Sequence, residues 1–121
     1  MEFCWVTLNV NDMKDSLKFY HDILGLEINS RFNAGEGIEI AMLGKADKPK
    51  VELICNEHHK IAERNTGISI GLEVESLDDI IKHLQNNGIN IIRGPYSPNP
   101  YLRFCFIKDP SGIEVQLVEN I

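Results

Sequence analysis

The stretch FCFIKDPSGIEVQLVE, residues 104–119, contains two alternating segments on either side of a turn. Side chains alternate at a period of two in YLRFCFI (101–107) and again in GIEVQLV (112–118). This period is typical of β-strands, whose successive side chains point to opposite faces of a sheet. The residues Asp-Pro-Ser-Gly at 109–112 favour a turn. We therefore predict two strands joined by a short turn.

The same pattern occurs earlier in the chain at a constant offset of 64 residues. The shift lays Val-Glu-Leu at 51–53 over Val-Gln-Leu at 115–117. Apolar positions also match in three other segments: Ile38, Ile40 and Met42 fall on Leu102, Phe104 and Phe106, Val10 and Met13 on Val74 and Leu77, and Leu17 and Tyr20 on Ile81 and Leu84. Because one offset fits separated segments, the chain contains an internal repeat.

Each repeat contains an amphipathic helix that follows a strand. Apolar residues recur at intervals of three and four after the capping residues Asp12 and Ser76, and the pattern ends at Gly25 and Gly88. The two predicted helices lie near 13–23 and 77–87.

Strands are predicted around both helices. We expect a short strand after each helix glycine, while RGPYSPNPY (93–101) carries three prolines and is predicted to be a loop. The other alternating segments are FCWVTLNV (3–10), GIEIAML (37–43), KVELIC (50–55) and GISIGLEV (67–74).

These elements predict an α+β fold made of two βαβββ modules in a pseudo-twofold repeat. We expect a single domain over residues 1–121. Module one covers 1–60, module two covers 67–121, and a polar connection covers 57–67.

Composition excludes several classes of protein. The 121 residues are 43% hydrophobic and 25% charged, which suits a globular domain with its own core. A net charge of -6 disfavours a nucleic-acid partner. No apolar run approaches a membrane span and MEFCWVTLNV does not resemble a signal peptide, so we expect a cytoplasmic protein without a membrane partner. The three cysteines form no CxxC pair, which favours reduced thiols.

Alternation also assigns side chains to two faces of the sheets. One face is apolar and is predicted to pack beneath the helices: Cys4, Val6, Leu8, Val10, Ile70, Leu72, Val74, Phe104, Phe106, Val115 and Leu117. The other face is mixed: Trp5, Thr7, Glu39, Glu52, Ile54, Ser69, Gly71, Glu73, Arg103, Cys105, Glu114 and Gln116. The mixed face is either a solvated surface or, if the sheet curves, the wall of a pocket.

FYHDILGLEI (19–28) and FCFIKDPSGIEVQLVE resemble the vicinal oxygen chelate superfamily, which includes lactoylglutathione lyase, extradiol dioxygenases and bleomycin-resistance proteins. The resemblance covers essentially the full chain and implies two βαβββ modules whose curved mixed or antiparallel sheets surround a shared cavity. Dimers are common in this superfamily, so the resemblance also implies a homodimer.

In the metal-using members, as the resemblance implies, four ligands come from the first and last strands of both modules. The repeat places these positions at Trp5, Glu52, Ser69 and Gln116. Glu52 is a strong metal ligand. The indole of Trp5 is only a hydrogen-bond donor, and the hydroxyl of Ser69 and the amide of Gln116 are neutral and bind metals weakly. We therefore predict no cofactor; the alternative is a weakly held divalent metal such as Ni, Zn, Fe or Mn.

A second candidate metal site lies in VELICNEHHK (51–60), where Cys55, Glu57, His58 and His59 lie close in sequence. Alternation predicts that Cys55 points into the helix-facing layer, away from Glu52, while both histidines lie in the polar connection. One C-x-x-H without a second pair is a weak zinc signal, so we do not expect a metal here.

The candidate site residues are assigned roles as follows. Glu52 is the candidate catalytic base and Arg103 the candidate anchor for a substrate anion, unless the two groups pair with each other or reach solvent. Trp5 offers a ring for stacking, and Thr7, Ser69 and Gln116 offer hydrogen bonds to a substrate. Cys105 is interpreted as a passive thiol rather than a nucleophile, and His21 and His83 as surface residues of the helices.

Three functions remain open at this point. The first is a metal-free protein that binds a small organic molecule in a dimeric cavity, similar to the bleomycin-resistance branch. The second is a lyase or isomerase resembling lactoylglutathione lyase, with Glu52 as acid/base or remaining metal ligand. The third is a non-catalytic dimeric scaffold. Metal content would discriminate the first two.

Overall fold

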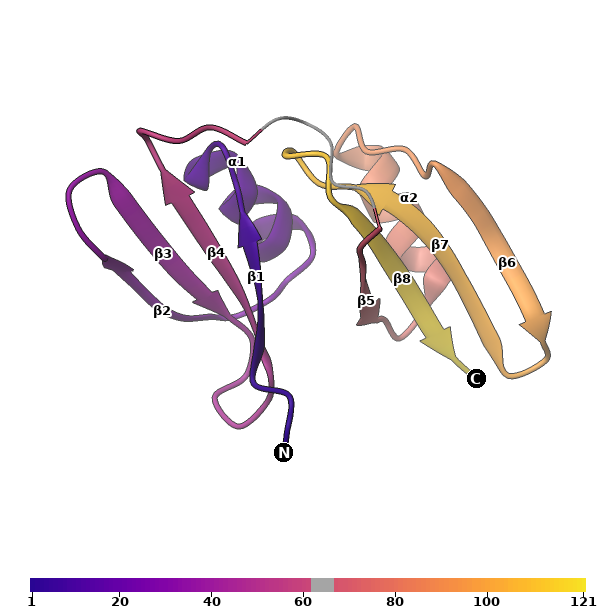
Figure 1. Ribbon diagram of the computed structural model, residues 1–121. Helices are drawn as coiled ribbons and strands as arrows, with labels where there is room; N and C mark the ends of the chain where they lie inside the picture. Colours follow the sequence, from indigo (N-terminus) through magenta and orange to yellow (C-terminus); the bar gives the residue numbers. More distant parts are fainter. Residues whose placement is uncertain (62–66) are drawn as a thin grey trace. The chain divides into compact units, whose positions relative to one another are not determined.

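The computed structural model describes residues 1–61 and 67–121 and divides the chain into two units, Met1–Ala62 and Glu63–Ile121. Each unit consists of one four-stranded mixed sheet and one helical segment (Figure 1). The predicted connection at 57–67 includes residues 62–66, which lie outside the described residues.

The first unit has the order strand, helix and three strands. The helical segment begins as an α-helix and continues for its last six residues as a π-helix, so it covers the predicted range. The elements are β1 (Trp5–Asn9), α1 (Met13–Leu17), the π-helix Lys18–Ile23, β2 (Ile28–Asn33), β3 (Ile38–Leu43) and β4 (Lys50–Asn56).

The second unit repeats this order, which confirms the predicted βαβββ modules. Its elements are β5 (Ser69–Glu73), α2 (Leu77–Asn86), β6 (Arg93–Asn99), β7 (Leu102–Lys108) and β8 (Glu114–Asn120). The sheet orders are equivalent, β1-β4-β3-β2 and β5-β8-β7-β6. In both sheets the first strand pairs in parallel with the fourth, and the remaining pairs are antiparallel.

The predicted caps set the helix ends. The side chains of Asp12 and Ser76 accept hydrogen bonds from the backbone N–H groups of Asp15 and Asp79. Gly88 has a φ of 75° just beyond α2, a conformation that favours glycine and ends the helix. Each helix is therefore bounded by short-range chemistry that the sequence contains.

Each core lies between the sheet and its own helix. In the first unit Leu8, Ala41 and Leu53 lie opposite one another in the strand register and are buried. In the second unit Val115 and Leu117 of β8 are fully buried, as predicted, together with Leu77 and Leu84 of α2. The apolar assignment is wrong for Cys4, which is exposed.

The predicted faces of β7 are reversed. Cys105 lies opposite Leu117 and is fully buried, while Phe106 lies opposite Gln116 on the other face. Phe104 and Phe106 are therefore outside the helix-facing core, and Cys105 and Ile107 are inside it. A shift of one residue in phase exchanges every side chain between the faces of a strand, which is the physical origin of the error.

Glu39 is also misassigned. It lies opposite Cys55, and its strand neighbour Ala41 lies opposite the buried Leu53. Glu39 therefore belongs to the helix-facing side, where it accepts a hydrogen bond from the Arg31 side chain. Cys55 is on this same side, as predicted.

The loop predicted at 93–101 is wrong, because Arg93–Asn99 forms the edge strand β6. The register with β7 pairs Arg93 with Phe106, Tyr96 with Phe104 and Asn99 with Leu102, with irregularities between these pairs. Proline lacks an N–H group and is tolerated in edge strands and at bulges, where the missing hydrogen bond costs little. The other expected short strand is found as β2.

The helices of the described part of the chain are too short or too polar for any of them to cross a membrane.

Candidate functional site

The first unit places three predicted site residues on the sheet face opposite its helix. Thr7 lies beside Glu52 in the strand register, and its hydroxyl donates a 2.6 Å hydrogen bond to the Glu52 carboxylate. Trp5 precedes Thr7 by two residues on the same face, and the residue is 52% exposed. The first unit therefore presents an indole ring and a hydroxyl-bound carboxylate on the same face of its sheet.

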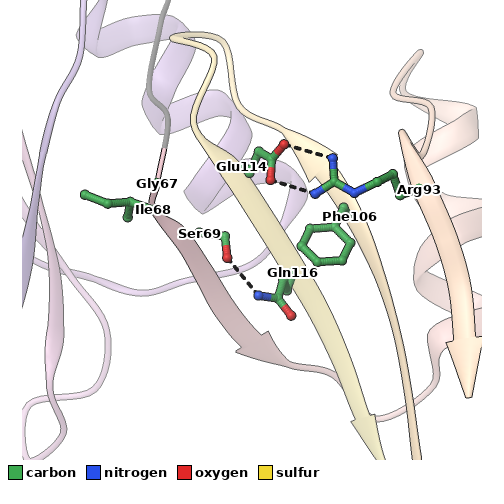
Figure 2. Close-up of a pocket in the computed structure, with 7 residues that line it drawn as sticks. All are labelled: Gly67, Ile68, Ser69, Arg93, Phe106, Glu114 and Gln116. Atoms are coloured by element: carbon green, nitrogen blue, oxygen red, sulfur yellow. Dashed lines mark hydrogen bonds and ion pairs between the residues drawn. The ribbon is translucent and has the colours of Figure 1, made fainter. Parts of the chain in front are cut away.

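The second unit carries a pocket of about 390 Å³ on the equivalent face of its sheet. Strand parity brings its side chains together, because Ser69 lies beside Glu114, Gln116 lies opposite Phe106, and Phe106 lies opposite Arg93. Figure 2 shows these side chains and the backbone of β5, β7 and β8. The residues that shape the site are Ile68, Ser69, Arg93, Phe106, Glu114 and Gln116.

Ser69 and Gln116 were predicted from the repeat, and the structure brings them into direct contact. The Gln116 side-chain amide donates a 2.8 Å hydrogen bond to the Ser69 hydroxyl. The hydroxyl keeps its own proton for donation, and the amide keeps its carbonyl oxygen as an acceptor. The pair therefore offers neutral groups of both kinds to a ligand.

The positive charge of this pocket comes from Arg93, which the sequence analysis missed. Both terminal nitrogens of Arg93 donate to the Glu114 carboxylate, at 3.0 and 2.7 Å. The guanidinium carbon also lies 4.2 Å from the centre of the Phe106 ring (Figure 2). Arg93 thus makes a bidentate ion pair and a cation–π contact at once.

The pair changes the acidity of both groups. The Arg93 hydrogen bonds lower the pKa of Glu114, and the nearby Lys108 charge acts in the same direction. The same hydrogen bonds raise the pKa of Arg93. Glu114 is therefore a stabilised carboxylate at neutral pH, which makes it a poor proton acceptor.

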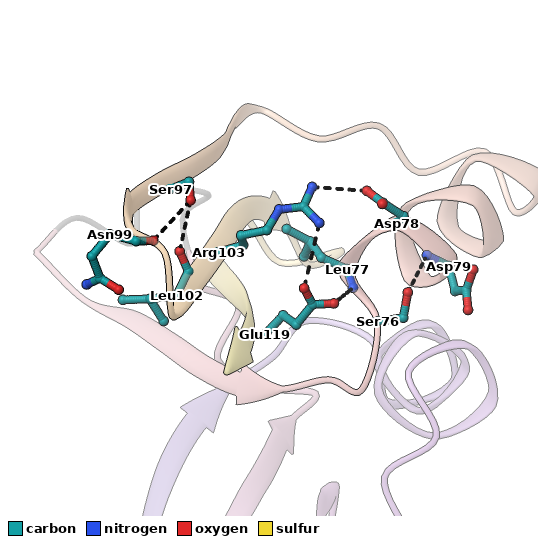
Figure 3. Close-up of polar contacts among 9 residues, drawn as sticks. All are labelled: Ser76, Leu77, Asp78, Asp79, Ser97, Asn99, Leu102, Arg103 and Glu119. Carbon is teal, nitrogen blue, oxygen red and sulfur yellow. Dashed lines mark hydrogen bonds and ion pairs between the residues drawn. The ribbon is translucent and has the colours of Figure 1, made fainter. Parts of the chain in front are cut away.

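Arg103 does not occupy its predicted position on the mixed face. It lies opposite Glu119 in the register, and its guanidinium contacts Asp78 at 3.0 Å and Glu119 at 3.6 Å (Figure 3). Glu119 also accepts a 2.8 Å hydrogen bond from the backbone N–H of Leu77. Arg103 therefore ties β7 and β8 to the beginning of α2, on the side opposite the pocket.

The expected convergence of Trp5, Glu52, Ser69, Arg103 and Gln116 on one cavity is wrong for Arg103, which lies on the helix side of its sheet. For the other four residues it stays a prediction: Trp5 and Glu52 share one face of the first sheet, and Ser69 and Gln116 share one face of the second. The signal that could have revealed Arg93 was the short strand expected after Gly88: the strand found there is β6, which begins at Arg93, the first residue of the predicted loop.

The residues at the four positions that hold the metal in metal-using members of the superfamily, as the resemblance implies, do not fit a transition metal. Trp5 has no lone pair for a metal, Ser69 and Gln116 are neutral and bonded to each other, and Glu52 supplies the one charged ligand of the set. His58 and His59 are exposed, and His58 lies 3.5 Å from Glu57. Among residues 1–61 and 67–121, no cluster of three or more His, Cys, Asp or Glu side chains could hold a metal ion.

The other residues considered from the sequence are Cys105, His21 and His83, and none of them lines the pocket. Burial raises the pKa of the Cys105 thiol, which suppresses the thiolate that nucleophilic catalysis requires. The Nδ1 atom of His21 lies 2.7 Å from the Leu26 carbonyl oxygen, so this histidine contacts the end of its own helical segment. His83 is an exposed residue of α2.

Comparison with known families and proteins agrees with the fold described above. A family model for the Glyoxalase/Bleomycin resistance protein/Dioxygenase superfamily matches residues 3–117. A lactoylglutathione lyase of Neisseria meningitidis serogroup A is 25% identical over 127 residues, which cover 99% of this chain and 91% of that protein.

Solved structures with the same fold include an enzyme and a binding protein. Glyoxalase I of Leishmania major matches 98% of this chain and 86% of its own, with a TM-score of 0.84 and 19% identity. TnmS3 of Streptomyces sp. CB03234, described as an antibiotic binding protein, matches 100% of this chain and 97% of its own, with a TM-score of 0.78 and 17% identity. At these identities the likeness shows the fold and leaves the activity open.

Proposed function

Because the chain belongs to the Glyoxalase/Bleomycin resistance protein/Dioxygenase superfamily, we propose that it binds a small organic molecule without a tightly bound metal ion. The proposal rests on the residues at the four expected metal-ligand positions, Trp5, Glu52, Ser69 and Gln116. One carboxylate, one hydroxyl, one amide and one indole give too few strong ligands to retain a divalent transition metal.

The second unit supports the binding part of the proposal. Its pocket combines the aromatic ring of Phe106, the neutral hydrogen-bonding pair Ser69 and Gln116, and the charged pair Arg93 and Glu114. In ligand pockets apolar side chains supply contact area, and polar groups fix the orientation of the ligand. These residues therefore provide both contact area and orientation for a small molecule.

Metal analysis and a ligand screen test the proposal together. Protein purified without an affinity tag should contain far less than one equivalent of Ni, Zn, Fe or Mn, and thermal-shift screening should find small organic compounds that raise its melting temperature. Compounds that bind should do so equally well after treatment with a chelator. Stoichiometric metal that is lost in Glu52→Gln, or a screen without any binder, would contradict the proposal.

A second candidate is a lyase resembling lactoylglutathione lyase. The observation that favours it is sequence similarity over 99% of the chain to a protein of that name. In this reading Glu52, held by the Thr7 hydroxyl, is the general base. The lyase reaction isomerises the glutathione hemithioacetal. A divalent metal held through Glu52 would supply Lewis-acid chemistry to this reaction, but Trp5, Ser69 and Gln116 would be weak partners for it.

An assay with the hemithioacetal of methylglyoxal and glutathione separates the two candidates. The binding proposal predicts no turnover above background, with or without added Ni²⁺ or Zn²⁺. Turnover that requires added metal and disappears in Glu52→Gln would establish the lyase in its place.

A further inference from the structure

We propose that the pocket of the second unit recognises an aromatic carboxylate, whose ring packs against Phe106 and whose carboxylate binds the Arg93 guanidinium. The inference rests on the proposed function and adds the chemical class of the ligand. Its basis is the arrangement in Figure 2, where the Arg93 guanidinium lies over Phe106 and reaches the Glu114 carboxylate.

Strand order explains how Arg93 is positioned. Arg93 is on β6 and Glu114 is on β8, so the guanidinium crosses β7 above Phe106 to reach its partner. The ring contact is a second interaction of the guanidinium, in addition to its hydrogen bonds to Glu114. Two of the five N–H groups of Arg93 are used by Glu114, and the others are available to a second acceptor.

The balance of charge selects an anion rather than a cation. Lys108 lies opposite Glu114 in the strand register, and its charge acts on the Glu114 carboxylate. Of the charged residues that line the pocket, Arg93 and Glu114 neutralise each other, and Lys108 beside Glu114 adds one positive charge. This excess positive charge favours an anionic ligand over a cationic one.

Breaking the ion pair between Arg93 and Glu114 also costs little free energy. The Arg93 and Glu114 side chains are 44% and 26% exposed, so water screens their attraction. Exposed ion pairs contribute little net free energy, which means that a ligand carboxylate can share or replace Glu114 as the partner of Arg93. The bidentate geometry that now holds Glu114 suits any other carboxylate equally well.

The neutral pair and the pocket size restrict the rest of the ligand. The Ser69 hydroxyl can donate, and the Gln116 carbonyl can accept, beside the ring. A volume of about 390 Å³ is near the lower end of ligand pockets and suits a compound of one or two rings. A polar substituent on the ring would meet the Ser69 and Gln116 pair.

Three probes that share a ring system and differ in charge test the inference. NMR titrations of the full chain with 1-naphthoate, 1-naphthamide and 1-naphthylmethylamine give dissociation constants and the residues whose signals shift. Wild-type protein should bind naphthoate most tightly, with shifts at Ser69, Phe106 and Gln116. Arg93→Gln should weaken naphthoate binding by about tenfold, the lower end for losing a hydrogen bond to a charged group, and leave the amide unchanged.

Two further variants keep the test decisive. Glu114→Gln removes the competing carboxylate and should tighten naphthoate binding. Arg103→Gln removes the same charge from the opposite face of the same sheet and should leave naphthoate binding unchanged. Melting curves confirm that each variant is folded.

The outcomes separate this inference from the proposed function. Equal binding of naphthoate and its amide, equal loss in Arg93→Gln and Arg103→Gln, or shifts confined to the first unit would each overturn the aromatic carboxylate. If the naphthalene probes fail while other compounds from the screen bind, the proposed function stands and this ligand class is wrong. If no small molecule binds, both fail.

Discussion

Arg93 and Arg103 carry the same charge in one sheet and have different surroundings. Arg93 is on an edge strand, faces the pocket and holds Glu114 across an aromatic ring. Arg103 faces the helix side and joins Asp78 and Glu119. Side-chain direction, rather than residue type, therefore decides which arginine can meet a ligand and which one supports the packing of α2.

The Arg93 and Glu114 pair should make stability depend on pH, with a small amplitude because water screens the exposed pair. Because the pKa of Glu114 is lowered by folding, its contribution to stability is present above the ordinary carboxylate value of 4.5 and is lost as pH falls through the folded value. The free energy of unfolding of wild type should therefore approach that of Glu114→Gln as pH decreases from neutral. Urea unfolding at a series of pH values measures this difference.

Arg93→Gln provides the control, since it removes the hydrogen bonds that lower the pKa of Glu114. In the Arg93→Gln background, the further change Glu114→Gln should have an effect on stability that depends less on pH. A wild-type advantage over Glu114→Gln that grows on acidification would show that the pair does not stabilise the folded state.

Cys105 should resist alkylation in the folded protein. Its side chain is fully buried and burial raises the pKa of its thiol, whereas Cys4 is exposed. With N-ethylmaleimide at mildly alkaline pH, Cys4 should be labelled rapidly and Cys105 only after unfolding in urea. Peptide mass spectrometry identifies the sites, and labelling of Cys105 as fast as Cys4 in native protein would contradict its buried position.

At the level of elements, local signals and tertiary contacts contribute differently. Ser76 caps the start of α2, and Leu77 and Leu84 form its buried side, so both features follow from nearby residues. β6 is different, because its prolines disfavour a strand on local grounds, and the strand forms through its pairing with β7. The edge position makes this possible, since one side of such a strand needs no partner.

Loss of the α2 cap should lower stability by a measurable amount. The Ser76 hydroxyl accepts a 3.2 Å hydrogen bond from the Asp79 backbone N–H, and removal of such a cap costs about 1 kcal/mol. Ser76→Ala should therefore reduce the free energy of unfolding by about this amount, measured by urea denaturation. Ser76→Asn retains an acceptor oxygen and should recover most of the loss; equal effects of both variants would argue against capping.

At the scale of the whole molecule, both sheets have open edges that a second copy of the chain could cover. Each sheet has four strands and ends in the short or irregular edges β1 and β2, or β5 and β6. We propose that the chain forms a homodimer, as the resemblance to its superfamily implies. A partner would protect sheet edges and extend the surface available to a ligand.

Sedimentation velocity tests the dimer. At tens of micromolar the protein should sediment as a species of twice the chain mass of 13.7 kDa, and dilution should reveal the dissociation to monomer if the dimer is weak. A single monomer species throughout this range would contradict the proposal and leave ligand binding to one chain.

The sequence by itself determined the two βαβββ modules, the helix limits and the poor metal-binding chemistry at Trp5, Ser69 and Gln116. These follow from periodicity, caps and residue type, all of which are local or repeat at a constant offset. Only the tertiary structure decided the faces of β7 and the role of β6. Both phases of YLRFCFI contain apolar residues, so alternation could not choose between Phe106 and Cys105 as the buried side chain. Pairing with β8 made that choice, because residues directly opposite in an antiparallel pair share a face, and it placed Arg93 rather than Arg103 at the pocket.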